Sequence, residues 1–206
     1  MIGLKSAAGQ FKTAANPAIT VMQSTGLDLT KRARLKAIIG AKSVLTGGDF
    51  KLASGGRSSV FFDMKMTLLD PEGINLVADL MLQLLEGERF DAIGGLVLGA
   101  CPIVDAITLK AYPARRITGF YVRKEPKERG TNKMIEGPLA PGAVCVMVED
   151  VTTEGRSVMK AVAEARAIGC RIATVATCVD RQQGARERLE AEGIAFKPLF
   201  TMDEFR

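Results

Sequence analysis

The stretch Val146-Met-Val-Glu-Asp-Val-Thr-Thr-Glu-Gly-Arg-Ser-Val158 decides the fold of this 206-residue chain. It begins as an apolar, β-branched run typical of a buried strand, meets two adjacent carboxylates, Glu149 and Asp150, and continues into a short turn and a helical pattern. Carboxylates accept hydrogen bonds from sugar hydroxyls, and loop amides at a helix N-terminus bind phosphate. The stretch therefore indicates a site for a phosphorylated sugar. A buried strand that runs into a capped helix, with solvated acids, is the equally open alternative.

The composition is that of an ordinary globular protein, with 47% apolar and 25% charged residues in a length that suits one domain. The absence of histidine excludes Ser-His-Asp hydrolysis and histidine-based zinc chemistry. The net charge of +5 is compatible with anionic substrates. Aromatic residues make up only 5% and do not interleave with a basic patch, so we expect no nucleic-acid partner.

The location and the cysteines follow from the same composition. No apolar run approaches the roughly 18 to 20 residues of a membrane helix, and nothing near the N-terminus resembles a secretion signal. We therefore expect a cytoplasmic protein with no membrane partner. The cysteines lack metal-type spacing and lie in apolar settings, which predicts reduced core thiols at Cys101, Cys145, Cys170 and Cys178.

The N-terminal part of the chain is predicted to form an arm and a small hood. Residues 1–26 show no periodicity and predict the arm, whereas residues 27–65 predict the hood. In the hood, helical spacing predicts a helix from a cap at Thr30 to about Ala41, and two β-like stretches around a glycine turn predict a hairpin over 50–64. Asp70 and Pro71 then predict a helix start, as N-cap and first-turn proline.

From residue 90 onward, apolar strands alternate with helices. Strands are expected at 92–98, 117–122, 143–148, 171–179 and, at an edge, 194–200; helices are expected at 102–111, 157–168 and 182–192. This alternation predicts an α/β fold, with a parallel sheet flanked by helices over a core of about residues 66–206. Residues 27–206 would then form a single domain, with ligands bound past the carboxyl ends of the strands.

Residues 123–142 break the alternation, because they are too polar and too rich in proline and glycine for a strand or a core helix. A connection of this length in a compact domain is usually a functional lid or a disordered segment. We expect a mobile lid; a solvated loop that balances its own charge is the alternative. Its cations are Arg123, Lys124, Lys127, Arg129 and Lys133.

Four features converge on one rim of the predicted sheet: the lid, the acid-loop-helix stretch, Gly94-Gly-Leu-Val-Leu-Gly-Ala-Cys-Pro102, and Asp180-Arg181. This combination resembles the type I phosphoribosyltransferases over about residues 45–200. Narrower strings are similar to the orotate-using branch of that family: Tyr121-Val-Arg-Lys-Glu-Pro-Lys-Glu-Arg-Gly-Thr-Asn-Lys-Met-Ile-Glu-Gly137, Leu52-Ala-Ser-Gly before Phe61-Phe-Asp, and Asp180-Arg-Gln-Gln-Gly184.

The resemblance implies transfer of phosphoribosyl from 5-phosphoribosyl 1-diphosphate to orotate, giving orotidine 5'-phosphate and pyrophosphate in de novo pyrimidine (UMP) biosynthesis. It assigns catalysis to one acid and to cations that neutralise the leaving pyrophosphate: Lys127, Lys124, Arg123 and Asp150. The sugar diphosphate would also contact Arg129, Glu149, Val151, Thr152, Thr153, Glu154, Gly155, Arg156 and Ser157. The glycines at 94, 95 and 99 would let the backbone approach the diphosphate.

For the base, the resemblance places orotate against Phe61 and Phe62, with Thr153 and Arg181 as further contacts. The planar fork of an arginine suits a carboxylate or carbonyl edge. The family's Mg²⁺ binds mainly through the substrate, and Glu149 and Asp150 would reach it through water. The resemblance also implies a homodimer in which the lid of one subunit reaches the site of the other.

Several positions depart from the family pattern. Many members have lysine where this chain has Ala53, and histidine where it has Arg129, which keeps a cation but cannot act as a near-neutral proton donor. In the phosphate loop, we expect Arg156 to add a phosphate contact and Glu154 to point outward. Two alternatives stay open: a phosphoribosyltransferase for another nucleobase, and a non-catalytic regulator that binds phosphoribosyl diphosphate.

Overall fold

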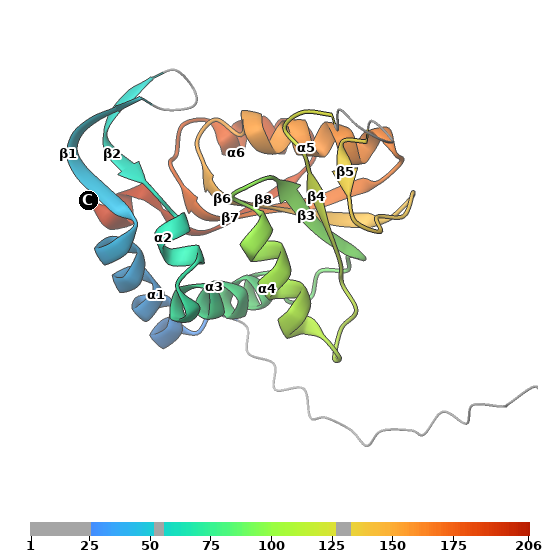
Figure 1. Cartoon of the computed structure of the whole chain (residues 1–206), viewed down its shortest axis with the longest axis horizontal. Coiled ribbons are helices and arrows are strands. Elements are labelled where there is room, and N and C mark those ends of the chain that lie inside the picture. The colour runs from blue at the N-terminus through green and yellow to red at the C-terminus, as the bar shows by residue number, and fades with distance from the viewer. Residues whose placement is uncertain (1–25, 52–55, 127–132) are drawn as a thin grey trace, which may run out of the picture.

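The computed structural model describes residues 26–51, 56–126 and 133–206. Its central element is a six-stranded sheet in the order β5-β4-β3-β6-β7-β8 (Figure 1). The strands are β3 (Ala92–Leu96), β4 (Thr118–Val122), β5 (Ile135–Glu136), β6 (Val144–Thr152), β7 (Arg171–Asp180) and β8 (Ala195–Thr201). All neighbouring strands are parallel except β4 and β5, which are antiparallel. The predicted parallel sheet, with its last strand at an edge, is confirmed.

Helices cover both faces of this sheet. On one face lie α5 (Arg156–Ala167) and α6 (Ala185–Ala191), and on the other lie α3 (Pro71–Leu84) and α4 (Cys101–Ala111) (Figure 1). The side chains of β6 alternate accordingly: Val146 and Val148 join the hydrophobic cluster of α3 and α4, whereas Cys145 and Met147 join that of α5. Two apolar layers therefore hold the strand that leads to the candidate site, and the predicted α/β fold is confirmed.

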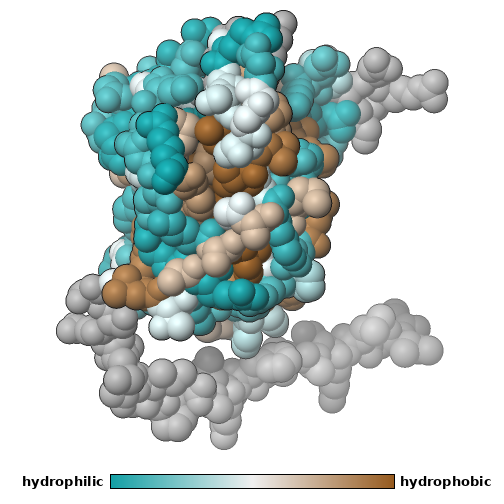
Figure 2. Space-filling model, turned by 90° about the vertical axis from the view of Figure 1, so that its left-hand side faces the viewer, coloured by the Kyte–Doolittle hydropathy of each residue, from teal (hydrophilic) through white to brown (hydrophobic). Residues whose placement is uncertain are grey.

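The N-terminal part adds a helix and a hairpin beside the sheet. After α1 (Leu29–Lys42), β1 (Val44–Lys51) and β2 (Arg57–Phe62) pair antiparallel as a separate two-stranded sheet, so the predicted hairpin is confirmed. A short helix, α2 (Lys65–Leu68), leads to α3, and a 3₁₀ turn, η1 (Met202–Phe205), follows β8. Figure 2 shows the face that carries the hairpin, where hydrophobic residues gather near the middle with hydrophilic residues beside them.

Two helix starts can be compared with their predicted caps. Asp70 caps α3 as predicted, since its carboxylate accepts a hydrogen bond from the amide of Gly73 at 2.9 Å and Pro71 is the first residue of the helix. The predicted cap of α1 is wrong: Asp28, and not Thr30, is its N-cap, and its side chain accepts from the amide of Thr30. Aspartate ranks above threonine as an N-cap, which explains the earlier start.

The difference that matters most for the site lies at the end of β6. The prediction ended this strand at Val148, but it continues through Glu149 and Asp150 to Thr152, paired with β7. The two acids therefore occupy successive strand positions, whose side chains point to opposite faces of the sheet. Residues 135–136 were also predicted to be loop, yet they form β5 against β4.

Two further expectations concern the arm and the cysteines. The arm lies outside the described residues apart from Gly26, so the division into arm, hood and core stays a prediction. No helix among the described residues is long and apolar enough to span a membrane. All four cysteines are free; Cys101, at the start of α4, is half-buried and the other three are buried.

Candidate active site

The candidate site lies at the carboxyl ends of β4, β3 and β6, which are neighbours in the sheet. The chain passes from β3 to β4 on one side and then returns to form β6 on the other side of β3. The chain therefore continues from β3 toward one edge of the sheet and from β6 toward the other edge. Open α/β sheets bind ligands in the crevice at such a point.

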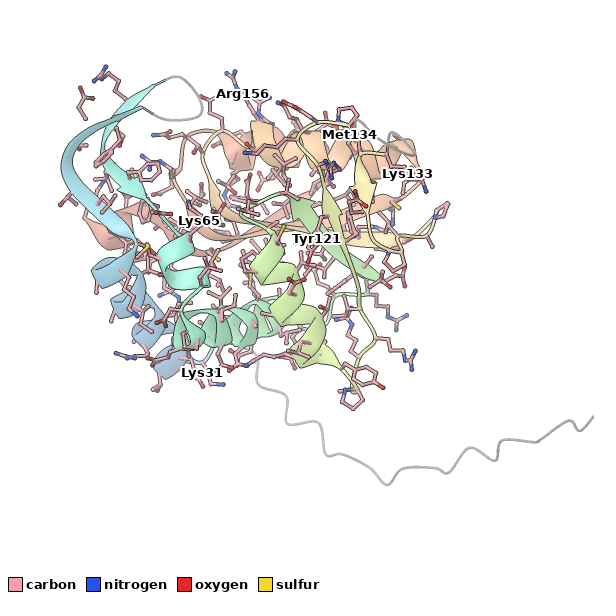
Figure 3. All side chains as sticks on the ribbon, in the orientation of Figure 1. Lys31, Lys65, Tyr121, Lys133, Met134 and Arg156 are labelled. Atoms are coloured by element: carbon pink, nitrogen blue, oxygen red, sulfur yellow. The ribbon has the colours of Figure 1, made fainter. Side chains whose placement is uncertain are left out.

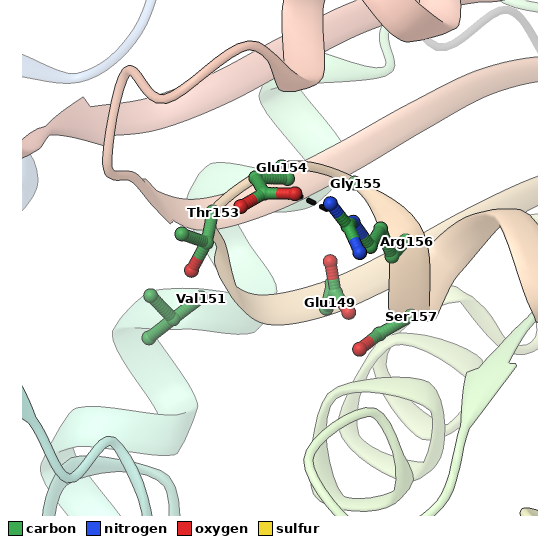
Figure 4. A pocket seen from close by; sticks show the side chains of 7 residues that line it. All are labelled: Glu149, Val151, Thr153, Glu154, Gly155, Arg156 and Ser157. Carbon is green, nitrogen blue, oxygen red and sulfur yellow. Dashed lines mark ion pairs between the residues drawn. The ribbon is translucent and has the colours of Figure 1, made fainter. Parts of the chain in front are cut away.

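The loop after β6 forms a pocket of about 110 Å³ at this crevice (Figure 4). Gly155 is the N-cap of α5 with a φ of 74°, a conformation that strains any other residue. Gly155 has no side chain to cap the first amides of α5, and the N-terminus of a helix attracts a phosphate through its amides and dipole. The pocket is lined by Glu149, Val151, Thr153, Glu154, Gly155, Arg156 and Ser157.

The two unusual residues of this loop pair with each other. The Glu154 carboxylate lies 2.5 Å from Nε of Arg156, and both residues line the pocket (Figure 4). Our expectation that Glu154 points outward is therefore wrong. Arg156 offsets the repulsion that this carboxylate would exert on a phosphate. Arg188 of α6 holds the loop in place, because its Nε donates to the Glu154 carbonyl at 2.7 Å.

Glu149 is buried beneath this loop, with 9% of its surface exposed. Burial raises the pKa of Glu149 to about 8, although a 2.8 Å hydrogen bond from the Thr152 hydroxyl acts in the opposite direction. Thr152 is itself fully buried. Its hydroxyl therefore supports Glu149 and does not line the pocket, and the predicted contact of Thr152 with the phosphate stays a prediction for its backbone amide.

Asp150 has different surroundings from Glu149. A Cβ atom at Gly99 would come within 2.5 Å of Asp150 Oδ1, so the loop after β3 needs glycine to accommodate the carboxylate. Burial raises the pKa of Asp150, whereas the charge of Lys65 lowers it. Lys65, labelled in Figure 3, begins α2 and pairs with Asp63 at 2.6 Å. The sequence interpretation missed this cation, since no motif surrounds it.

Two glycines predicted to approach the diphosphate have an internal explanation instead. Gly94 and Gly95 lie within β3. A Cβ at Gly94 would overlap the ring of Phe120, and one at Gly95 would come within 2.2 Å of the Val148 carbonyl oxygen. Packing inside the sheet therefore accounts for both.

The cationic side of the site is a groove past the end of β4. It is lined by Val97, Tyr121, Arg123, Lys124, Glu125 and Glu136. Arg123 lies 3.3 Å from Glu136 of β5, and its amide donates to the carbonyl of Met134, so β5 holds the first residue of the predicted lid. Lys127 and Arg129 lie outside the described residues, as does Ala53, and their roles stay predictions.

Arg181 lies just after β7 and is buried against β2 with 3% of its surface exposed. Its two terminal nitrogens donate to the Val60 carbonyl and the Ser58 hydroxyl at 2.9 to 3.2 Å. Its Nε is buried without a hydrogen-bond partner among the described residues, and no described carboxylate forms an ion pair with it. Burial lowers the pKa of Arg181.

The two phenylalanines predicted to contact the base occupy successive positions on β2, so their side chains point to opposite sides. Phe62 is buried on the same side as Arg181, whose Cζ lies 5.7 Å from its ring. Phe61 instead stacks near Phe50 of β1, with ring centroids 5.6 Å apart. Of the two rings, Phe62 is the one placed beside the arginine.

Comparison with known proteins identifies the family. Orotate phosphoribosyltransferase of Rhodopseudomonas palustris (strain TIE-1) is 44% identical to this chain over 183 residues, which cover 84% of this chain and 95% of the relative. The chain belongs to the orotate phosphoribosyltransferase family. No family model matches the chain.

Solved orotate phosphoribosyltransferases share the fold. The Mycobacterium tuberculosis enzyme in complex with Fe(III) dicitrate superposes with a TM-score of 0.75 at 34% identity, covering 85% of this chain and 98% of that one. The same enzyme in complex with 5-phospho-alpha-D-ribosyl 1-diphosphate gives a TM-score of 0.71 at 31% identity with the same coverage. The family resemblance predicted from the sequence is confirmed.

The raised pKa of Glu149 predicts a pH-dependent stability for this orotate phosphoribosyltransferase family member. Between the ordinary value of 4.5 and about 8, the folded protein keeps a proton that the unfolded chain has released. The free energy of unfolding should therefore fall as pH rises through this window, by up to about 1.4 kcal/mol per pH unit. Glu149→Gln should reduce this fall, as measured by urea unfolding of metal-free protein at pH 5 and pH 8.

The control is Glu86→Gln at an exposed position after α3. It should leave the pH dependence unchanged. If the Glu149 variant lost as much stability between the two pH values as the parent, Glu149 would not be a carboxyl that stays protonated in the folded protein.

Proposed function

We propose that this protein transfers the phosphoribosyl group of 5-phosphoribosyl 1-diphosphate to N1 of orotate, releasing pyrophosphate and giving orotidine 5'-phosphate for pyrimidine synthesis. The observation that carries the choice of base is the buried guanidinium of Arg181, whose Nε has no partner in the described chain. An uncompensated buried charge costs several kcal/mol. A ligand with a negative edge removes that cost, and orotate carries a carboxylate whereas uracil and the purine bases are neutral.

The sugar phosphate would bind on the other side of the crevice. The uncapped start of α5 offers amides and a favourable dipole to the 5-phosphate, together with Thr153, Ser157 and the cation of Arg156. Glu149 and Asp150 would accept hydrogen bonds from the ribose hydroxyls from two sides of β6. Glu149 can accept such a bond even while it is protonated, because its carbonyl oxygen has a second lone pair beside the one that accepts from Thr152.

The chemistry requires charge stabilisation more than it requires a nucleophile. As the bond from C1 to the diphosphate breaks, positive charge develops on the sugar and negative charge grows on the leaving group. Arg123 and Lys124 lie in the groove past β4, where they can neutralise the departing diphosphate, and Lys127 and Arg129 would add to them. Lid closure would exclude water and so prevent hydrolysis of the activated sugar.

The acids of β6 fit a magnesium ion that the substrate carries. No group of three or more acidic or cysteine side chains in the described part of the chain is arranged to hold a metal. Glu149 and Asp150 point to opposite faces of one strand and do not form a chelating pair. They would instead contact, through water, an Mg²⁺ held by diphosphate and ribose oxygens, where the ion neutralises phosphate charge.

We also propose a cytoplasmic homodimer in which each lid reaches the partner's site. Exposed apolar side chains support a second copy as a partner, because such groups gain from burial. They come from α2 and its end, the loop after β3, and α4: Met66, Leu69, Leu98 and Leu109. The oligomeric state is measurable by sedimentation.

Asp150→Asn should weaken binding of phosphoribosyl diphosphate by about 10- to 100-fold, because hydrogen bonds to a charged group contribute about 1.5 to 3 kcal/mol. Calorimetric titration with the sugar diphosphate and Mg²⁺ measures this directly. The matched control is Asp91→Asn at the opposite edge of the sheet, where the side chain accepts from the Val144 amide at 2.9 Å. If the Asp150 variant binds phosphoribosyl diphosphate as tightly as the parent, Asp150 does not contact the sugar.

The function is tested by mixing the protein with Mg²⁺, phosphoribosyl diphosphate and one base at a time, and following pyrophosphate release. Release with orotate, and not with uracil, adenine, guanine or hypoxanthine, is expected. Release with another base alone would assign the enzyme to that base. Binding of the sugar diphosphate without release for any base would indicate a regulator.

A further inference from the structure

The hairpin holds the Arg181 side chain through three hydrogen bonds. Both terminal nitrogens of the guanidinium donate to the Val60 carbonyl, at 3.1 and 3.2 Å, and one of them also donates to Oγ of Ser58 at 2.9 Å. The hairpin thus engages both terminal nitrogens, and among the described residues Nε is the guanidinium nitrogen that has no hydrogen-bond partner. Because a guanidinium is planar, fixing its two terminal nitrogens also fixes the direction in which Nε points.

Ser58 is the centre of this arrangement. Its hydroxyl donates to the Val60 carbonyl at 2.9 Å and accepts from the Val60 amide at 3.1 Å as well as from Arg181. A hydroxyl has one donor and two acceptor positions, and all of them are used here. Ser58 therefore couples the local shape of β2 to the orientation of a side chain 123 residues further along the chain.

The same face of β2 carries the remaining neighbours of the guanidinium. Side chains two residues apart on a strand share a face, which places those of Ser58 and Phe62 on the side of Arg181. Ser59 lies between them in sequence, is exposed, and faces away. The backbone of Arg181 is anchored separately, through its amide to the Thr152 carbonyl at 2.8 Å, next to the phosphate loop.

We infer that Ser58 is a positioning residue for base recognition: it holds the Arg181 guanidinium so that Nε faces the anionic edge of the pyrimidine. This inference rests on the proposed function and deepens it, because it concerns how the site selects a carboxylate-bearing base. Without the hydroxyl, the guanidinium keeps only its two bonds to the Val60 carbonyl, at 3.1 and 3.2 Å, and a single acceptor oxygen allows it to pivot. A rotated guanidinium loses its advantage for the anionic base over the neutral one.

The test compares two nucleotides that differ by the carboxylate alone, orotidine 5'-phosphate and uridine 5'-phosphate, in calorimetric titrations of the full-length protein. Ser58→Ala should lower the ratio of the two affinities about tenfold by weakening the orotidine nucleotide, with the uridine nucleotide and ribose 5-phosphate bound as before. Ser58→Thr keeps the hydroxyl and should restore the ratio. Ser59→Ala should leave all three affinities unchanged.

The outcomes separate this inference from the function on which it rests. If the parent fails to release pyrophosphate with orotate, the proposed function fails first. If the parent is active and Ser58→Ala weakens all three ligands equally, or weakens none, Ser58 has at most a structural role and the inference is overturned. Thermal unfolding of each variant identifies any that do not fold, and Ser58→Thr then supplies the comparison: a normal ratio supports the inference, and a ratio as low as that of an Arg181 variant contradicts it.

Discussion

Replacing Arg181 with methionine should reduce kcat/KM for orotate by about 200- to 5000-fold while leaving the protein folded. Truncating one partner of a buried, hydrogen-bonded charge pair costs about 3 to 5 kcal/mol, and the pair here forms only when the anionic base binds. The free protein buries this charge with 3% exposure and no described carboxylate partner. An apolar side chain of similar length should therefore be tolerated in the ligand-free fold, with a melting temperature close to that of the parent.

The matched control lies at the other end of the same strand. Arg171, the first residue of β7, is exposed and lies at the opposite edge of the sheet. Arg171→Met should leave steady-state kinetics unchanged. A strongly destabilised Arg181 variant would mean that the guanidinium is mainly structural. Normal turnover of orotate by a folded Arg181 variant would mean that Arg181 does not contact the base.

The second large effect is expected at Lys127, which lies in the predicted lid outside the described residues. Lys127→Ala should lower kcat by about 100- to 1000-fold, the cost typical of removing one donor that stabilises transition-state charge. The KM for phosphoribosyl diphosphate should change far less, because the charge on the leaving group grows mainly in the transition state. Initial rates of pyrophosphate release at varied substrate concentrations give both parameters.

Lys160→Ala provides the comparison, since Lys160 is an exposed lysine on α5. It should behave as the parent does. Comparable losses of kcat and of substrate affinity in the Lys127 variant would indicate ground-state binding and would contradict the role of the lid in catalysis.

Much of the fold could be predicted because its signals are local. The alternation of apolar strands with helices identified the parallel sheet, and Asp70 followed by Pro71 marked the start of α3. The end of β6 could not be predicted in the same way. Acids usually signal the end of a buried strand, yet Val151 and Thr152 have high β propensity and extend the pairing with β7.

In the site, too, the parts that could be predicted are those formed by residues close together in the sequence. The phosphate loop was recognisable because strand, glycine and helix start are contiguous in the sequence. The contact between Arg181 and the hairpin joins residues 123 positions apart, so neither this contact nor an Nε without a partner among the described residues could be predicted from a linear pattern. Similarly, the sequence shows Glu149 and Asp150 as a pair, whereas alternation along β6 sends them to opposite faces.

A crystal structure of the protein with orotidine 5'-phosphate tests the central claim most directly. We predict the 5'-phosphate on the amides at the start of α5, and the orotate ring on the Phe62 side of β2 with an acceptor within hydrogen-bond distance of Arg181 Nε. A nucleotide bound elsewhere, or one whose base leaves Nε of Arg181 without a partner, would contradict it.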